Sequence, residues 1–190
     1  MPILSAQRLS VARGERVLLK DFSLTLEPGA LVHLRGANGA GKTSLLETLA
    51  GLRRPAAGEV ARPDALHWIG HRNALNLALS PLENLRWWCA INALDRSAVQ
   101  PALEQLGVGS LRHRACRTLS AGQKRRSALA RLVASKRPLW LLDEPLDGLD
   151  ADGLALIAQL LSAHLSGGGA AMVTSHQPLP AQLPRREVTL

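Results

Sequence analysis

Aromatic residues are scarce in this sequence, which has no Tyr, one Phe and 3% aromatic residues in all. Proteins that bind RNA or single-stranded DNA commonly stack bases on aromatic rings, so the scarcity of aromatic residues argues against binding of nucleic acid. The net charge of +8 would otherwise suit nucleic acid or an anionic membrane surface. We therefore expect no nucleic-acid partner.

The sequence also has few cysteines and no long apolar run. Cys89 and Cys116 lack CxxC spacing, which predicts buried or inert thiols. The longest apolar stretches, "PLWLLD" and "LALIAQLLSAHL", are shorter than the roughly 18 to 20 residues of a membrane span. The first residues show no signal-peptide pattern, so we expect a cytosolic chain. With 190 residues, it fits one domain with a real core.

Short apolar runs alternate with helical patterns along the chain. Strands are predicted at 2–11, 16–26, 30–36, 65–70, 137–145 and 170–176. Helices are predicted at 43–52, 81–106, 123–135 and 153–165, and a loop at 53–64. This alternation predicts an α/β domain around a mostly parallel sheet, in which ligands bind beyond the carboxyl ends of the strands.

The helical patterns also predict which side chains are buried. In the first helix, apolar residues recur at Leu45, Leu46, Leu49 and Leu52. In the helix at 123–135 we expect a core stripe of Leu129, Leu132 and Val133, with Lys124 and Arg125 exposed. Before the helix at 81–106, Ser80 is a candidate cap with Pro81 in the first turn.

The stretch "GANGAGKTS" fits the phosphate-loop pattern G-x-x-x-x-G-K-[ST] between a strand and a helix. Its backbone N–H groups would surround phosphates, Lys42 would reach the β- and γ-phosphates, and the Thr43 hydroxyl would bind Mg²⁺. A glycine-rich turn with a solvated lysine is the alternative. The expected ATP-binding residues here are Gly36, Ala37, Asn38, Gly39, Ala40, Gly41, Lys42, Thr43 and Ser44.

The stretch "LWLLDEP" is an apolar run that ends in two acidic residues. Asp143 would hold Mg²⁺ at the end of the strand, and Glu144 would orient or deprotonate the attacking water. Alone, such a run is often a strand with a solvated tip. The phosphate loop in the same chain makes the catalytic interpretation the stronger one.

Five motifs occur in one order, "GANGAGKTS", "LSAGQ", "LWLLDEP", "GLD" and "TSH". This set resembles the ATP-binding subunits of ATP-binding cassette (ABC) transporters over nearly the whole chain. The resemblance implies one domain over 1–190, with an N-terminal antiparallel β subdomain and a helical subdomain near 72–135. It also implies ATP and Mg²⁺ as ligands, and a head-to-tail dimer that encloses two ATP molecules.

In such a dimer, the signature residues Ser120, Ala121, Gly122 and Gln123 would contact ATP held by the other copy. They begin a helix, where N–H groups and the helix dipole favour an anion. A capped helix that binds nothing is the alternative. By the same resemblance, His176 would contact the γ-phosphate and its water, and Asp150 would lie in the loop that crosses to the partner. For Asp150, a role as helix N-cap competes.

Two positions depart from the family pattern. Arg13 stands where the family usually has an aromatic residue that stacks on adenine; its guanidinium can stack on a base, although a solvated turn residue is the alternative. His71 stands where the family has the glutamine that senses Mg²⁺ and touches the membrane subunit. We expect His71 to have a coupling role.

The stretches "WIGHRNALNLALSPLENLRWW" and "TSHQPL" resemble the branch of ATP-binding subunits associated with cytochrome c maturation and haem export. This implies integral membrane partners and a peripheral place on the cytoplasmic face of the bacterial inner membrane. Residues 71–81 with Trp87 and Trp88 would form the docking surface, unless the tryptophans fill the insert's own core. No C-x-x-C-H occurs, so we expect no direct haem site in this chain.

Three alternatives remain open from the sequence. The chain could energise another small ABC transporter. It could be a soluble ABC ATPase acting on nucleic acid or ribosomes, although such proteins commonly carry two cassettes or an inserted coiled coil. It could also be a nucleotide-binding regulator that switches without hydrolysis.

Overall fold

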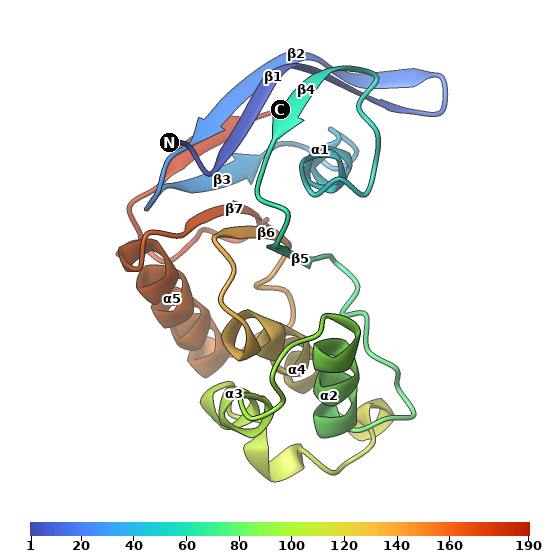
Figure 1. Cartoon of the computed structure of the whole chain (residues 1–190), viewed down its shortest axis with the longest axis vertical. Helices are drawn as coiled ribbons and strands as arrows, with labels where there is room; N and C mark the ends of the chain where they lie inside the picture. Colours follow the sequence, from blue (N-terminus) through green and yellow to red (C-terminus); the bar gives the residue numbers. More distant parts are fainter. The chain divides into compact units, whose positions relative to one another are not determined.

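The computed structural model describes residues 1–190, which form two compact units (Figure 1). Unit 1 comprises residues 1–70, 137–145 and 158–190. Unit 2 comprises residues 71–136 and 146–157. None of the helices is both long and apolar enough to span a membrane.

Unit 1 contains a three-stranded antiparallel sheet in the order β2-β1-β4. Its strands are β1 (Leu4–Arg13), β2 (Arg16–Leu26) and β4 (Ala57–Ala61). The prediction of a loop at 53–64 was wrong for β4. This strand is short and almost wholly exposed, so pairing with β1 rather than its own apolar pattern defines it.

A five-stranded parallel sheet follows in the order β5-β6-β7-β3-β8. Its strands are β5 (Leu66–Ile69), β6 (Leu139–Asp143), β7 (Ala170–Thr174), β3 (Leu31–Arg35) and β8 (Arg186–Thr189). Every residue of β6 and β7 is buried, as expected for central strands covered on both faces. The edge strand β8 was not predicted, because its residues are mainly polar and exposed.

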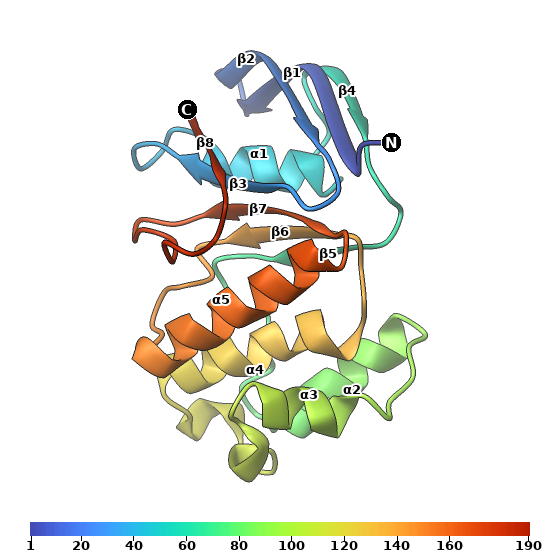
Figure 2. The ribbon, with the colours of Figure 1, turned by 90° about the vertical axis from the view of Figure 1, so that its left-hand side faces the viewer.

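Helix α1 (Lys42–Leu49) lies between the two sheets, as Figures 1 and 2 show. Leu45, Leu46 and Leu49 are fully buried in a core that both sheets line. Leu52 does not continue this face. The helix ends at Leu49, Gly51 turns the chain with φ 77°, and Leu52 is 64% exposed.

The opposite face of the parallel sheet carries residues 158–166, the second half of helix α5 (Ala151–Ser166) (Figure 2). Here the ring of His164 stacks on that of Trp140 in β6, with centroids 3.9 Å apart. The neighbours of Trp140, Leu139 and Leu141, point into the core around α1. The strand alternation therefore assigns β6 side chains to both layers.

Unit 2 contains helices α2 (Pro81–Ile91), α3 (Val99–Gln105) and α4 (Ala121–Ala134), which pack on one another, with short 3₁₀ turns at Gly109–Leu111 and Cys116–Thr118. The predicted single helical stretch at 81–106 is two helices. Ala93, with φ 52°, breaks it. The predicted cap is confirmed, because the Ser80 hydroxyl accepts from the Glu83 N–H and the Glu83 carboxylate accepts from the Ser80 N–H.

Arg125 corrects the prediction for α4. Its side chain was expected in solvent, yet Arg125 is 2% exposed and its guanidinium donates to Asn73 Oδ1 at 3.0 Å. The helical period explains this burial. Arg125 lies four residues before Leu129 and seven before Leu132, on the same stripe as these buried leucines.

Cys89 and Cys116 are free thiols buried in unit 2. Burial raises the pKa of both, because it penalises the thiolate. At Cys116 the Asn84 amide, 3.5 Å from Sγ, opposes that rise. The prediction of buried thiols is confirmed.

Candidate functional site

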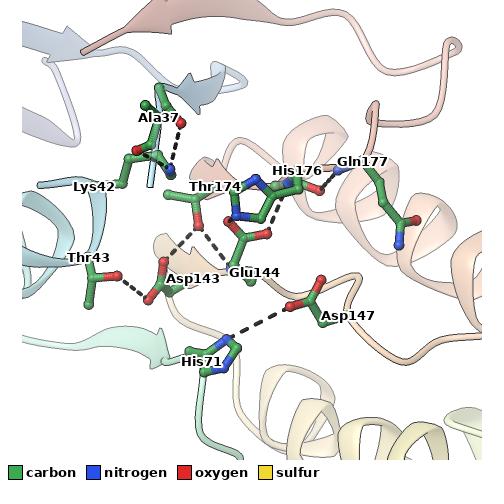
Figure 3. Close-up of polar contacts among 12 residues, drawn as sticks. Ala37, Lys42, Thr43, His71, Asp143, Glu144, Asp147, Thr174, His176 and Gln177 are labelled. Carbon is green, nitrogen blue, oxygen red and sulfur yellow. Dashed lines mark hydrogen bonds and ion pairs between the residues drawn. The ribbon is translucent and has the colours of Figure 1, made fainter. Parts of the chain in front are cut away.

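The phosphate loop runs from the end of β3 into α1. Gly41 precedes the helix with φ 101°, and a Cβ there would lie 3.2 Å from Leu18 Cβ, so both backbone and space favour glycine. Lys42 folds back across the loop and donates to the carbonyl oxygens of Gly36 at 2.7 Å and Ala37 at 3.1 Å (Figure 3). The ammonium group is therefore held beside the loop backbone.

The other predicted loop residues differ in exposure. Ala37, Asn38 and Gly39 are exposed, whereas Gly36 and Ala40 are partly buried. Ser44 is only 8% exposed, and its carbonyl accepts from the Thr48 hydroxyl within α1. Ser44 thus lies inside the first turn of α1.

Asp143 ends β6 next to Thr174, which ends β7, because these two residues pair in the parallel register. The Thr43 hydroxyl donates to Asp143 Oδ2 at 2.8 Å, and the Thr174 hydroxyl donates to Asp143 Oδ1 at 2.7 Å. A carboxylate that is 2% exposed is thereby bonded at both oxygens. The structure brings the two predicted metal ligands, Thr43 and Asp143, together.

Glu144 has a left-handed backbone conformation, with φ 50°. Such a conformation is uncommon for a residue with a side chain and costs about 1–3 kcal/mol. The Thr174 hydroxyl accepts from the Glu144 N–H at 2.9 Å, which helps to hold it. The turn separates Asp143 from Glu144, so that adjacent carboxylates face different partners.

His176 contacts Glu144 through both its backbone and its ring (Figure 3). Its N–H donates to Glu144 Oε2 at 3.0 Å, and its Nε2 lies 3.5 Å from Oε1. The His176 side chain is 55% exposed while that of Glu144 is 9% exposed. The ring is therefore open to solvent beside a largely buried carboxylate.

The donor chemistry suits a hard divalent cation. Mg²⁺ is usually held by one or two carboxylates together with hydroxyl, water and substrate phosphate oxygens. No group of three or more His, Cys, Asp or Glu side chains is placed to hold a metal by itself. Thr43 and Asp143 offer the hydroxyl and carboxylate oxygens that magnesium prefers beside a phosphate ligand.

In unit 2, the four signature residues begin helix α4. The Ser120 hydroxyl accepts from the Gln123 N–H at 3.2 Å, and Gln123 Oε1 accepts from the Ser120 N–H at 3.0 Å. The capping alternative is thus present, and it leaves the Ser120 hydroxyl hydrogen and the first-turn N–H groups of Ala121 and Gly122 for another acceptor. A Cβ at Gly122 would lie 2.6 Å from the Gly148 carbonyl oxygen.

Asp150 caps α5, as the competing interpretation holds. Its Oδ1 accepts from the Gly153 N–H at 2.9 Å, and its Oδ2 lies 3.7 Å from Arg126. The side chain is nonetheless 63% exposed. Capping therefore leaves much of the carboxylate open to a partner.

Two departures from the family pattern lie at exposed positions. Arg13 ends β1 and faces Arg16 across a hairpin turn at Gly14. His71 begins unit 2, and its Nδ1 lies 3.8 Å from Asp147 Oδ2 (Figure 3). Neither contact defines a nucleotide subsite by itself.

Two residues of the site were missed from the sequence. Thr174 bonds both Asp143 and Glu144, and His33 contacts the segment that carries His176. In the sequence, each is visible only as a polar residue at the end or in the middle of an apolar strand. Their contacts with the site follow from the strand order, which places β7 between β6 and β3.

The site combines a phosphate loop after β3, two adjacent acidic residues at the end of β6 and a histidine after β7. This combination at the carboxyl ends of parallel strands defines a P-loop ATPase. The sequence model of the ABC transporter family matches residues 19–147. The dimeric ATP-binding cassette MJ0796, in a post-hydrolysis state with ADP and Pi, has a similar fold, with a TM-score of 0.87 at 23% identity over 98% of this chain and 94% of that one.

Two curated relatives of the chain belong to one subgroup of the ABC transporter family. The cytochrome c biogenesis ATP-binding export protein CcmA of Hyphomonas neptunium is 49% identical, over 92% of this chain and 90% of its own length. CcmA of Rhodobacter capsulatus is 46% identical, over 93% and 82%. The chain therefore belongs to the ABC transporter family, as a CcmA-like ATP-binding protein.

Proposed function

We propose that this chain is the ATP-hydrolysing subunit of a haem exporter that serves cytochrome c biogenesis. The likeness to the CcmA proteins supports the export process. The single structural observation that carries the hydrolytic role is the linked set Thr43–Asp143–Thr174–Glu144–His176 at the carboxyl edge of one sheet. The catalytic residues would be Glu144, His176 and Lys42.

The phosphate loop would bind the ATP phosphates through backbone N–H groups and the start of α1. Lys42 would exchange its bonds to the Gly36 and Ala37 carbonyls for phosphate oxygens. Thr43 and Asp143 would hold Mg²⁺, which would neutralise charge on the phosphates. Arg13 would contact the adenine by stacking its guanidinium plane.

Glu144 would orient or deprotonate the attacking water, because its carboxylate is shielded and fixed. His176 would keep the carboxylate in place through its N–H and direct its exposed ring toward the γ-phosphate. This division of work needs two neighbouring segments, one after β6 that carries Glu144 and one after β7 that carries His176.

The complete site would require a second copy of the chain. Ser120 and the N–H groups of Ala121 and Gly122 would contact ATP bound by the partner, with Gln123 holding the cap. Asp150 would add a partly exposed carboxylate at the crossing loop. Unit 2, residues 71–136 and 146–157, would thus carry the parts that act in trans.

Integral membrane subunits would dock on unit 2 along residues 71–81 and α2, at the cytoplasmic face of the inner membrane. Apolar side chains are unusually open there, with Leu77 51%, Trp87 63% and Ile91 75% exposed, whereas Trp88 is partly buried. His71 would couple this surface to the nucleotide. A membrane complex that survives Trp87→Ala together with changes across 71–81 would contradict the docking site.

Cells that lack this chain should lose covalent haem on c-type cytochromes while retaining b-type cytochromes. Expression of the wild-type chain should restore the covalent haem, and Glu144→Gln at equal abundance should not. Haem staining of denaturing gels measures this directly. Unchanged c-type cytochromes in the deleted strain would contradict the export role, and salt-sensitive binding of nucleic acid without membrane recovery would favour the soluble alternative.

A further inference from the structure

A buried histidine, His33, lies in β3 three residues before the phosphate loop. It is 2% exposed and its neighbours Val32 and Leu34 belong to the hydrophobic core. Burying the polar imidazole costs free energy of hydration, which burying an apolar side chain would not. Packing alone would therefore favour an apolar residue at this position, and the histidine points to a specific polar contact.

The ring makes that contact with the segment after β7. His33 Nε2 lies 3.3 Å from the Ser175 carbonyl oxygen, and because a carbonyl only accepts, Nε2 must carry the hydrogen. Ser175 is also buried, with 6% exposure. The bond joins the strand that leads into the phosphate loop to the segment that carries His176.

The other ring nitrogen has no hydrogen-bond partner. Nδ1 is buried and lies 3.8 Å from Glu187 Oε1, beyond hydrogen-bond distance. Glu187 is the β8 register partner of His33 and is bonded by Arg35 at 3.2 Å, which lowers the pKa of Glu187. The carboxylate thus stays ionised beside the ring, while Nε2 alone makes the directed bond.

The three residues after Val173 are anchored in succession. Thr174 bonds Asp143 and Glu144, Ser175 accepts from His33, and His176 donates to Glu144. The His33 bond adds a side-chain anchor from the phosphate-loop strand to the backbone pairing of Leu34 with Thr174. Its loss would leave the Ser175 carbonyl without this partner, in the same peptide unit as the His176 N–H that donates to Glu144.

We propose that His33 is a positioning residue for ATP hydrolysis, which holds the Ser175 carbonyl and thereby keeps His176 against Glu144. This role rests on the proposed ATPase function. It requires a hydrogen-bond donor at the position of the His33 Nε2 and no contact with ATP. A small displacement of an orienting group slows the chemical step far more than binding.

The matched variants are His33→Gln, whose amide nitrogen reaches about as far as Nε2, and His33→Leu, which has similar bulk but no donor. His164→Leu is the control. It removes a histidine whose Nε2 lies 3.1 Å from the Ala170 carbonyl, at the other end of β7. All are studied as the full chain, by steady-state ATP hydrolysis and by amide hydrogen exchange without nucleotide.

We expect His33→Leu to lower kcat about ten- to hundredfold with KM for ATP within about threefold of wild type. Exchange at the His176 amide should accelerate. His33→Gln should restore kcat to within about threefold and slow that exchange, and His164→Leu should leave both unchanged. If His33→Leu does not fold, His33→Asn replaces it, since its shorter amide cannot reach Ser175 and the same loss is expected.

Wild-type kcat in folded His33→Leu or His33→Asn would overturn the proposal, as would an equal loss in His33→Gln. An equal loss in His164→Leu would also overturn it, because burial rather than the bond to Ser175 would then be responsible. A wild-type chain without ATP hydrolysis would instead overturn the proposed function. The two failures are therefore distinguishable.

Discussion

Thr174 is the residue on which the two acidic side chains depend. Its hydroxyl donates to Asp143 and accepts from the N–H of Glu144, whose backbone is strained. One oxygen atom therefore hydrogen-bonds to both acidic residues. The residue is fully buried, and neither bond can be replaced readily by water. The sequence singled out Asp143 and Glu144 but not this link, because only the pairing of β6 with β7 places the hydroxyl there.

Thr174→Val keeps the shape of this side chain and removes both bonds. We expect the free energy of unfolding to fall by about 1–3 kcal/mol, since a buried N–H and a carboxylate oxygen each lose a partner. The turnover rate should fall by about tenfold or more because Glu144 is released. Chemical denaturation and ATP hydrolysis measure the two effects, and Thr174→Ser, which keeps the hydroxyl, should show much less of either.

The elements of the parallel sheet were predictable where burial dominates. The apolar runs at β3, β6 and β7 are covered on both faces, and their pattern predicts strands without ambiguity. The edge strand β8 and the edge strand β4 of the antiparallel sheet are largely exposed and have no apolar run, so neighbouring strands rather than residue preference define them. The charge of Arg125 led to the prediction of an exposed side chain, but Arg125 is buried because it lies on the same face of α4 as the buried leucines.

The contact between α5 and β6 should make stability depend on pH through His164. Burial against Trp140 lowers the pKa of His164 below its ordinary 6.5, although the bond to the Ala170 carbonyl opposes this. Below about pH 6.5, His164 takes up a proton in the unfolded chain more readily than in the folded chain. The free energy of unfolding is therefore highest above this pH and falls as the pH decreases. Denaturation between about pH 7.5 and 5.5 should show the loss, and His164→Gln should flatten it. An unchanged slope would contradict this account.

For the whole protein, the proposed division of the site between two copies has a direct test. Lys42→Ala damages the phosphate loop, and Gly122→Val places a side chain against the Gly148 carbonyl and distorts the signature turn. Each variant alone should be inactive. In a random mixture, half of the dimers combine the two variants, and each of those holds one intact site, so about a quarter of wild-type hydrolysis should return. A mixture that stays inactive would contradict a site shared in trans.

The central claim is that the chain binds and hydrolyses ATP through Glu144. Its most direct test is the release of inorganic phosphate, measured beside ATP affinity, for the wild-type chain, Lys42→Ala and Glu144→Gln. We expect Lys42→Ala to lose tight ATP binding. Glu144→Gln should bind ATP with near wild-type affinity while its phosphate release falls about a hundredfold or more. Wild-type phosphate release in Glu144→Gln, or ATP binding without hydrolysis in the wild-type chain, would contradict the account.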